Sequence, residues 1–250
     1  MTGTRSKRTT SRFAIAFAAL LGAAAPQALA DGFPWLDTLD AGDDVRASGT
    51  QLIALPMDLH RLDRDGGSPT AATIAVHGWN SAGYEWVHLL KTLDDAKSST
   101  WFWRWDWNRC PGEAADTLAE RLATAPFTEL DRIRLIGHSY GGVLVTAAAE
   151  RWQGSVPLEV HAIAAPLAGV GDRCPYRTPE ALPPKVAFHE WRTRHQLDGA
   201  FRQMPTDPQV IDLPGSSVTR LPATYNGRRL GHNWSVSWVA ETLAGRTPDP

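Results

Sequence analysis

A serine set between two glycines, at the junction of two apolar segments, constrains this chain more than any other feature. The pattern G-x-S-x-G occupies residues 137–141, with Ser139 at its centre. Residues 131–136 have the character of a short strand, and residues 142–152 that of an apolar helix. A turn this sharp strains the serine backbone, and only small residues fit two positions away on either side. We therefore expect Ser139 Oγ to project above a sheet, with the N–H groups of the helix start beneath it.

The pattern by itself does not define the fold. With ordinary frequencies of glycine and serine, G-x-S-x-G arises by chance in roughly one chain in ten of this length. The wider context is rarer, because a strand must precede the turn, a helix must follow it, and an acid and then a histidine must come later. The interpretation therefore depends on whether the rest of the chain supplies those parts.

The composition is that of an ordinary globular protein. The chain has 250 residues, 43% of them hydrophobic, and a formal net charge of -2. This length predicts one domain, which buries roughly 70–75% of its unfolded surface without a disulfide scaffold. The weak charge gives no support for a nucleic-acid partner. The sequence contains no CxxC pair, no HExxH and no G-x-G-x-x-G after a strand, so we expect no metal and no cofactor.

The first thirty residues differ from the rest of the chain. A start rich in Arg and Lys precedes the apolar run 13–25, and a small-x-small cleavage pattern ends at Ala30. These features predict a secretory signal peptide at residues 1–30 and a folded domain at 31–250. The apolar run is too short to span a bilayer, so no stable membrane anchor is expected. Cleavage near Ala30 would leave an exported protein, either periplasmic or secreted.

The two cysteines of the chain both lie in the part expected after cleavage. Cys110 and Cys174 fall in segments with loop character. In an oxidising compartment a disulfide between them is favoured over two free thiols, although sequence alone does not show that they come close enough.

Apolar segments of two kinds alternate along the chain. Segments with strand character are expected at 50–56, 59–62, 71–77, 101–107, 131–137, 158–164, 185–193 and 209–213. Segments with helical periodicity are expected at 84–93, 111–125, 142–152 and 233–244. This alternation predicts an α/β fold, with a mostly parallel central sheet and helices on both faces. Residues 165–184, rich in Pro and Gly, are interpreted as a short loop in place of a cap domain, and therefore as a minimal lid.

Four tryptophans recur at every second position between residues 101 and 107. This spacing puts Trp101, Trp103, Trp105 and Trp107 on one face of a strand. An exposed face of this kind would suit carbohydrate binding. We favour packing between a central strand and its covering helices, because large aromatic side chains mostly serve burial. The last one or two of the four are candidates to line a pocket.

A serine hydroxyl becomes a nucleophile only when a base takes its proton. The candidate bases are His161, His189, His195 and His232. The first two lie within expected strands, where a structural role is favoured. His232 lies in a loop after the last strand and directly before the last helix, where a base reaches over the serine. His232 is therefore predicted as the base, with His195 as the alternative.

The base must be oriented by an acid, and four carboxylates are candidates. Asp198 follows the expected strand 185–193 in an Asp-Gly turn that would hold it beside the histidine ring. Asp207 lies in a plain turn between prolines and is the main rival; Glu190 and Asp172 are further candidates. Either Asp198 or Asp207 could fix the histidine tautomer and stabilise the imidazolium. Asp198 is the predicted acid.

Two backbone N–H groups are expected to stabilise the oxyanion of an attacked carbonyl. One belongs to Tyr140, the residue after the serine, and the other to Trp79, in the loop that follows the strand 71–77. His77, at the start of that loop, is interpreted as a packing and hydrogen-bonding residue.

At this point the chain resembles the α/β-hydrolase superfamily. The order of oxyanion loop, serine, acid and histidine is similar to that of the family, and the resemblance covers most of residues 31–250. It depends on His77-Gly78-Trp79, Gly137-His138-Ser139-Tyr140-Gly141-Gly142, Asp198-Gly199 and Gly231-His232-Asn233. The single glycine of the oxyanion loop resembles lipases and esterases with medium acyl or alcohol pockets. The chain departs from many members in its minimal lid.

The resemblance implies an exported serine hydrolase of the esterase or lipase type. Its substrate would be a small-molecule or lipid ester, cleaved through an acyl-enzyme on Ser139. An acyltransferase or thioesterase would use the same triad, and a non-catalytic binding protein would use the tryptophan stretch as its contact surface. The sequence makes no prediction of the oligomeric state.

Overall fold

A computed structural model describes residues 32–64, 67–169, 174 and 176–249. The expected signal peptide at 1–30 and the candidate acid Asp172 lie outside these residues. Among the helices of the described ranges, none combines the length and the apolar character needed to cross a membrane.

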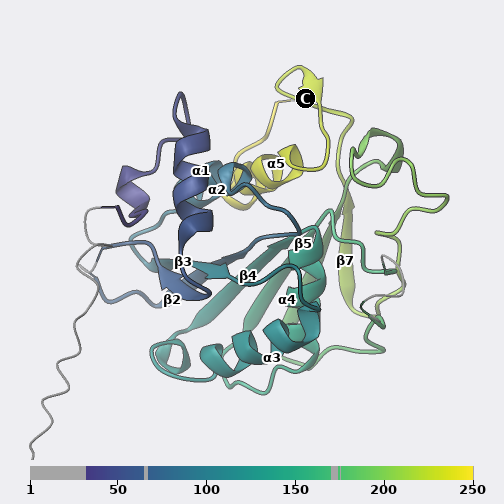
Figure 1. The fold of residues 1–250 in the computed structure, drawn as a ribbon. Coiled ribbons are helices and arrows are strands. Elements are labelled where there is room, and N and C mark those ends of the chain that lie inside the picture. Colours follow the sequence, from purple (N-terminus) through teal and green to yellow (C-terminus); the bar gives the residue numbers. More distant parts are fainter. Residues whose placement is uncertain (1–31, 65–66, 170–173, 175, 250) are drawn as a thin grey trace, which may run out of the picture. The chain divides into compact units, whose positions relative to one another are not determined.

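The folded unit is built on a seven-stranded sheet with the strand order β1-β3-β2-β4-β5-β6-β7 (Figure 1). Strand β1 is antiparallel to β3, and every other neighbouring pair in this sheet is parallel. The strands are β1 Asp58–Arg61, β2 Ala71–Val76, β3 Ser98–Arg104, β4 Arg132–His138, β5 Leu158–Ile163, β6 Val186–Arg192 and β7 Ser216–Arg220. The carboxyl ends of the parallel strands therefore meet at one edge of the sheet, where ligands bind in folds of this kind.

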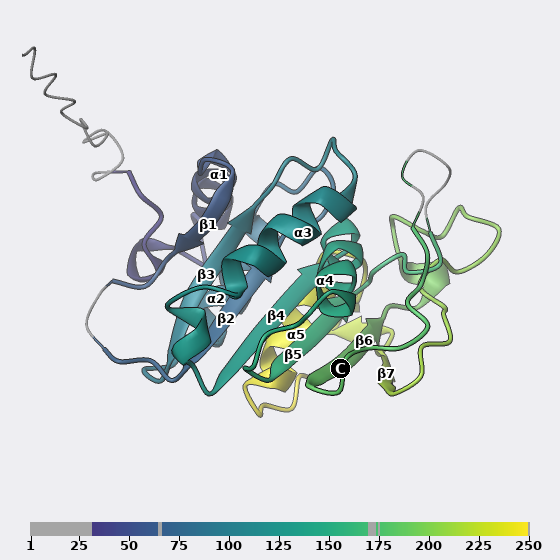
Figure 2. The same cartoon turned by 90° about the horizontal axis from the view of Figure 1, so that it is seen from below.

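Helices cover both faces of the sheet. In Figures 1 and 2, α1, α2 and α5 lie on one face, and α3 and α4 lie on the other. The helices are α1 Val45–Ala54, α2 Tyr84–Thr92, α3 Pro111–Leu122, α4 Tyr140–Glu150 and α5 Trp234–Leu243. Short 3₁₀ segments occur at Leu36–Thr38, Phe127–Glu129 and His195–Leu197. The prediction of a mostly parallel sheet with helices on both faces is confirmed.

Burial on both faces explains the composition of the central strands. Every residue of β2 is buried, because one face packs on α4 and the other on α2. Its side chains divide between two apolar clusters, with Ile74 in one and Ala75 in the other. A parallel strand covered on both sides has no solvent face, so its sequence is a continuous apolar run without alternation.

The expectation of a strand at 50–56 is wrong, because these residues belong mainly to α1. The buried positions Ser48, Leu52 and Leu55 follow a spacing of three to four residues, which is helical. Gly49 fits this helix closely against the next one: a Cβ there would lie 2.2 Å from Tyr84 N. The short run of apolar residues was therefore one side of a helix.

The expectation of a strand at 209–213 is also wrong. Side chains occupy backbone hydrogen-bonding groups of this segment: Arg192 Nη2 donates to Ile211 O (2.9 Å), and Gln209 N donates to Asp207 Oδ1 (3.1 Å). The edge strand is β7, at 216–220, where three of five residues are exposed. Because an edge strand with little burial needs no apolar pattern, its sequence carried no strong signal.

A small hairpin, β8 Thr224–Tyr225 and β9 Arg228–Arg229, was not expected. Its turn is Asn226-Gly227, and both residues have positive φ, 50° and 67°. An Asn-Gly pair favours this two-residue turn, so the signal was present in the sequence, although the strands on either side are only two residues long.

The tryptophan stretch packs mainly into the core. Trp103 and Trp105 are buried in the apolar cluster beneath α3 and α4, and Trp101 and Trp107 are partly buried against the same cluster. The packing interpretation is confirmed for the stretch as a whole. Trp107, beyond the end of β3, also lines a cavity.

Candidate active site

Ser139 lies in the turn that connects β4 to α4. Its backbone has φ 55° and ψ -124°, a conformation that costs free energy in a residue with a side chain. A Cβ on Gly137 would lie 2.4 Å from Gly141 O, and one on Gly141 would lie 2.3 Å from Val76 O. Only glycine fits at these two positions, and the crowding there holds the serine in its strained conformation.

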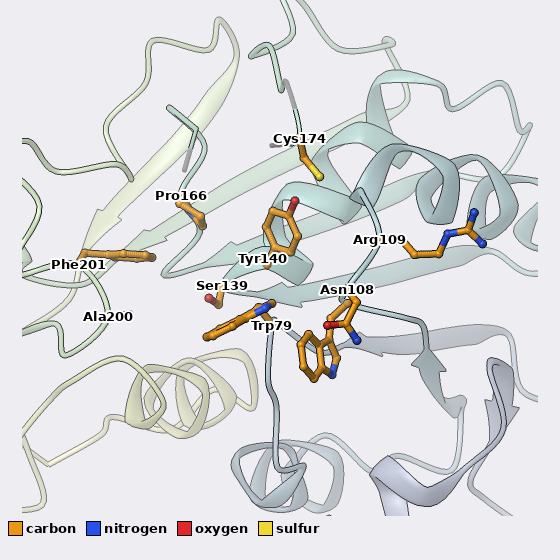
Figure 3. A pocket seen from close by; sticks show the side chains of 10 residues that line it. Trp79, Asn108, Arg109, Ser139, Tyr140, Pro166, Cys174, Ala200 and Phe201 are labelled. Atoms are coloured by element: carbon orange, nitrogen blue, oxygen red, sulfur yellow. The ribbon is translucent and has the colours of Figure 1, made fainter. Parts of the chain in front are cut away.

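The loop after β2 crosses directly over this turn. A Cβ on Gly78 would lie 2.8 Å from His138 O and 2.9 Å from the Cβ of Ser139. This close approach brings Trp79 beside the serine, and the Trp79 side chain remains 63% exposed. Trp79 and Tyr140, the first residue of α4, line a cavity together with Ser139, and Figure 3 shows the side chains of all three residues.

His232 and Asp198 are joined by a hydrogen bond of 2.9 Å between Nδ1 and Oδ2. Asp198 is fully buried, and it also accepts hydrogen bonds from Thr193 Oγ1 (2.5 Å) and Ala200 N (2.8 Å). Burial acts to raise the pKa of Asp198, but the hydrogen bonds from His232 and Thr193 outweigh it, and the pKa lies below its usual value. Asp198 is therefore ionised at neutral pH and fixes the orientation of the His232 ring.

The other candidate acids pair elsewhere. Asp207 Oδ2 accepts from Arg220 Nη1 at 3.1 Å, and its Oδ1 accepts from Gln209. Glu190 is buried in an ion pair with Arg192, with 2.6 Å between the charged atoms. Neither carboxylate is bonded to a histidine, so Asp198 is the candidate acid that contacts the candidate base.

The alternative base, His195, has a different partner. Its Nε2–H donates to Phe201 O at 2.8 Å, which anchors the chain that follows Asp198. Phe201 in turn meets the His232 ring edge-to-face, with 4.9 Å between ring centroids. His195 thus supports the loop beside the site.

His161 and His189 stack on each other within β5 and β6, with 4.9 Å between their ring centroids. Together with Glu159 they form a group that could hold a metal ion. Trp191 Nε1–H donates to His161 Nδ1 (3.1 Å), so the proton of the neutral ring is on Nε2, which contacts Glu159 at 3.0 Å. Neither nitrogen of His161 then offers a lone pair, so this group does not fit a metal, and its histidines have the structural role expected for them.

His77 is fully buried and has the packing role predicted for it. Its Nδ1–H donates to Gly78 O at 3.0 Å, and Trp105 Nε1–H donates to His77 O at 2.8 Å. Burial, with the Arg104 charge in a smaller role, lowers the pKa of His77 to about 4. A neutral ring in this position stabilises the loop that carries Trp79.

His138, the residue before the serine, has a supporting role that sequence analysis missed. Its Nε2–H donates to His232 O at 3.1 Å, and the two rings are 4.6 Å apart. Burial, followed by the nearby His232, lowers the pKa of His138 to about 3, so the ring is neutral. His138 ties the loop of the candidate base to the serine turn. Its place next to the serine was the only available signal.

A cavity of about 380 Å³ opens on one side of Ser139; it is called the large cavity below. It is mostly apolar, and Figure 3 shows it from close by. Its lining residues are Trp79, Trp107, Asn108, Arg109, Ser139, Tyr140, Pro166, Cys174, Ala200 and Phe201. The predicted disulfide between Cys110 and Cys174 is present, and it ties this part of the wall to the start of α3.

A smaller cavity of about 90 Å³ also borders Ser139; it is called the small cavity below. Polar side chains dominate its wall. Its lining residues are Gly78, Trp79, Asn80, Ser81, Ala82, Tyr84, Glu85, His138, Ser139, His232 and Asn233. Ser139 and His232 are thus brought to the same small cavity, whereas His232 does not line the large one. Glu85 is a further residue here that sequence analysis missed.

The strand order and the strained serine turn are those of the α/β-hydrolase fold, and comparison with solved structures agrees. Est1E from Butyrivibrio proteoclasticus is similar with a TM-score of 0.51 and 14% identity, over 75% of this chain and 90% of that one. A lipase-esterase related protein from Clostridium acetobutylicum is similar with a TM-score of 0.50 and 12% identity, over 76% and 98%. A hydrolase from Agrobacterium vitis, described as putative, is similar with a TM-score of 0.50 and 12% identity, over 76% of this chain and 99% of that one. No protein-family model matches the chain, and neither does any curated protein sequence.

Proposed function

We propose that this protein is a serine hydrolase of carboxylic esters, with Ser139 as nucleophile, His232 as base and Asp198 as the acid that orients it. The observation that carries the proposal is the meeting of a strained serine and a bonded His–Asp pair at one cavity. The hydrogen bond from His232 Nδ1 to Asp198 fixes the tautomer in which Nε2 accepts a proton. The likeness to esterases and lipases supports the fold, and the reaction is inferred from the site.

The first half of the reaction would acylate Ser139. His232 Nε2 takes the hydroxyl proton as Oγ attacks the ester carbonyl, and the backbone N–H groups of Trp79 and Tyr140 stabilise the oxyanion. The C–O bond to the alcohol then breaks, and His232 returns the proton to the departing oxygen. Buried, ionised Asp198 stabilises the imidazolium between these two transfers.

In the second half, water would replace the alcohol. His232 takes a proton from the water as it attacks the acyl-enzyme, and returns it to Ser139 Oγ when the acid leaves. The large cavity suits an apolar acyl group of moderate size, because aromatic rings form much of its wall. A small-molecule or lipid ester fits these dimensions.

Labelling of the nucleophile tests the proposal directly. A fluorophosphonate probe is expected to label the folded protein at Ser139, and Ser139→Ala is expected to abolish both labelling and hydrolysis of 4-nitrophenyl acetate. Ser155→Ala, at an exposed serine distant from the turn, is the matched control and should keep both. Full activity in Ser139→Ala would refute the assignment.

An acyltransferase or a thioesterase would use the same residues with a different acceptor or substrate. Product analysis with an added alcohol, and with an acyl thioester in place of the ester, separates these activities from hydrolysis. The non-catalytic alternative needs the tryptophan stretch as an exposed contact surface, and the burial of Trp103 and Trp105 argues against it. Of the tryptophans, Trp79 and Trp107 line the large cavity.

We also propose export, with residues 1–30 removed. The disulfide between Cys110 and Cys174 supports this, because disulfides persist mainly in oxidising compartments. Mass spectrometry of the protein recovered from the producing cell's exterior or periplasm would give its N-terminus. A chain that stays in the reducing cytosol, with residues 1–30 intact, would contradict the proposal.

A further inference from the structure

Glu85, in the first turn of α2, is a buried carboxyl group with one oxygen unused. The side chain is 6% exposed. Its Oε1 accepts a hydrogen bond from Ser81 Oγ, and Oε2 has no hydrogen-bond partner among the described residues. A buried polar atom without a partner costs about 1–3 kcal/mol, so a group of this kind in a folded protein calls for an explanation.

The unused oxygen belongs to a residue of the small cavity, which Ser139 and His232 also line. Glu85 lines a second cavity as well, of about 280 Å³, and the two cavities share Tyr84 and Asn233. Asn233 Nδ2 donates to Tyr84 Oη at 2.9 Å, which fixes these two side chains to each other. The wall beside His232 is therefore polar and held in place.

The direction of proton transfer identifies what this cavity receives. When the ester bond breaks, the departing alcohol oxygen takes its proton from His232, so the alcohol must lie beside that ring. His232 lines the small cavity and not the large one. The alcohol side of the ester therefore faces Glu85, and the acyl side faces the large cavity.

The volume of the small cavity indicates more than a single water. One water needs about 10–15 Å³ of such space, and the cavity has about 90 Å³. Burial raises the pKa of Glu85 above its usual value, and its unpartnered Oε2 can accept a hydrogen bond from a hydroxyl group. Both properties suit a small group that has a hydroxyl of its own.

We propose that the small cavity is a subsite for a hydroxylated alcohol, a polyol or a sugar, and that Glu85 Oε2 hydrogen-bonds a second hydroxyl of that alcohol. This inference rests on the proposed function. Ester hydrolysis releases the alcohol with the proton of His232, and acyl transfer runs the same step backwards, with the alcohol oxygen giving its proton to His232. A site built to bond a substrate hydroxyl discriminates against the analogue that lacks it.

Partitioning of the acyl-enzyme measures this subsite without changing the acyl group. The protein is acetylated with 4-nitrophenyl acetate in the presence of glycerol or 1-propanol, two acceptors with three carbons each, and the acetyl esters and acetate are quantified. The wild type is expected to transfer more acetyl to glycerol than to propanol at equal concentration. Glu85→Leu should reduce the glycerol-to-propanol ratio about fivefold, the size of one neutral hydrogen bond.

Two further variants separate binding from a structural role. Glu85→Gln keeps a hydrogen-bonding side chain of the same shape and should restore most of the ratio. Glu120→Leu, at an exposed position of α3, is the matched control and should leave the ratio unchanged. Thermal unfolding of each variant reports whether it folds, and the wild-type ratio tests the proposal even if Glu85→Leu does not fold.

The outcomes are distinguishable. Absence of fluorophosphonate labelling at Ser139 would overturn the proposed function itself. Normal labelling with equal transfer to glycerol and propanol in the wild type would overturn only the subsite. An equal loss for both acceptors in Glu85→Leu would show that Glu85 holds the turn or a water, and this would also overturn the subsite.

Discussion

Replacement of Asp198 by asparagine should hold the proton of the neutral His232 ring on Nε2, so that the ring no longer acts as a base toward Ser139. Ala200 N donates to Asp198 Oδ1 at 2.8 Å, so the amide oxygen of the asparagine introduced there has to occupy that position. The amide NH₂ then faces His232 Nδ1, which can only accept from it. The ring proton moves to Nε2, and this nitrogen no longer takes the proton of Ser139.

The expected loss is large because the fold prevents the amide from turning over. Turning it would set its NH₂ against the N–H of Ala200, donor against donor, in a site where Asp198 is fully buried. The same change in a buried triad aspartate of the serine proteases lowers kcat about 10⁴-fold, which corresponds to about 5 kcal/mol in the barrier. We expect a loss of that order for Asp198→Asn in hydrolysis of 4-nitrophenyl acetate.

Asp207→Asn is the matched control, because it removes a charge from the rival acid, which pairs with Arg220. Its activity should stay within about threefold of the wild type. If Asp198→Asn kept activity within tenfold, or if Asp207→Asn lost as much, the assignment of the acid would be wrong.

Asp198→Asn should also change how the free energy of unfolding depends on pH. The pKa of Asp198 is lowered in the folded state, so the ionised carboxylate stabilises the fold above the ordinary value of about 3.9, and this contribution is lost as the pH falls through the lower folded value. Urea unfolding should therefore show a wild type more stable than Asp198→Asn at pH 7, with the difference shrinking toward pH 3. A difference that grew in acid would contradict this sign.

Three further predictions concern the serine turn, the disulfide and the wall of the large cavity. Gly137→Ala would put a Cβ 2.4 Å from a backbone oxygen and should destabilise the protein by about 1–3 kcal/mol and abolish probe labelling; Gly112→Ala, where a Cβ meets nothing within 4 Å, should be neutral or stabilising in the same urea unfolding. The double variant Cys110→Ser with Cys174→Ser removes a cross-link between residues 64 apart and should lower the free energy of unfolding by about 4 kcal/mol; an unchanged unfolding midpoint would count against a stabilising disulfide. Trp107→Ala removes an aromatic wall of the large cavity and should reduce the kcat/KM ratio of octanoate to acetate esters about tenfold; an equal effect on both esters would show that the acyl chain binds elsewhere.

The serine turn could be predicted from sequence because its constraint is local. A side chain at Gly137 or Gly141 would clash with backbone atoms within the turn or directly beneath it. The two glycines therefore indicate the geometry of the turn. The order of the later motifs allowed His232 and Asp198 to be named as partners, and the structure brings them together. The strand β2 could be predicted in the same way, because a strand that is buried on both faces consists of a continuous run of apolar residues.

The missed features depend on contacts between distant segments. Glu85 looks like an ordinary acidic residue near a helix start, yet it is buried, and the neighbouring Tyr84 bonds to Asn233 in the loop before α5. The helix α1 was mistaken for a strand because a short apolar run suits either element until its neighbour is known. The edge strand β7 is half solvated and owes its conformation to β6, not to its own residues.

The hydrogen bond from His138 to the carbonyl of His232 joins two segments that lie far apart in the sequence. The proposed nucleophile lies near the middle of the chain, whereas its proposed base lies almost a hundred residues later, just before α5. A chain that ends before residue 232 would lack the group that we propose takes the proton of Ser139. Under the proposed function, Ser139 would therefore gain its base only in a chain that has folded as far as α5.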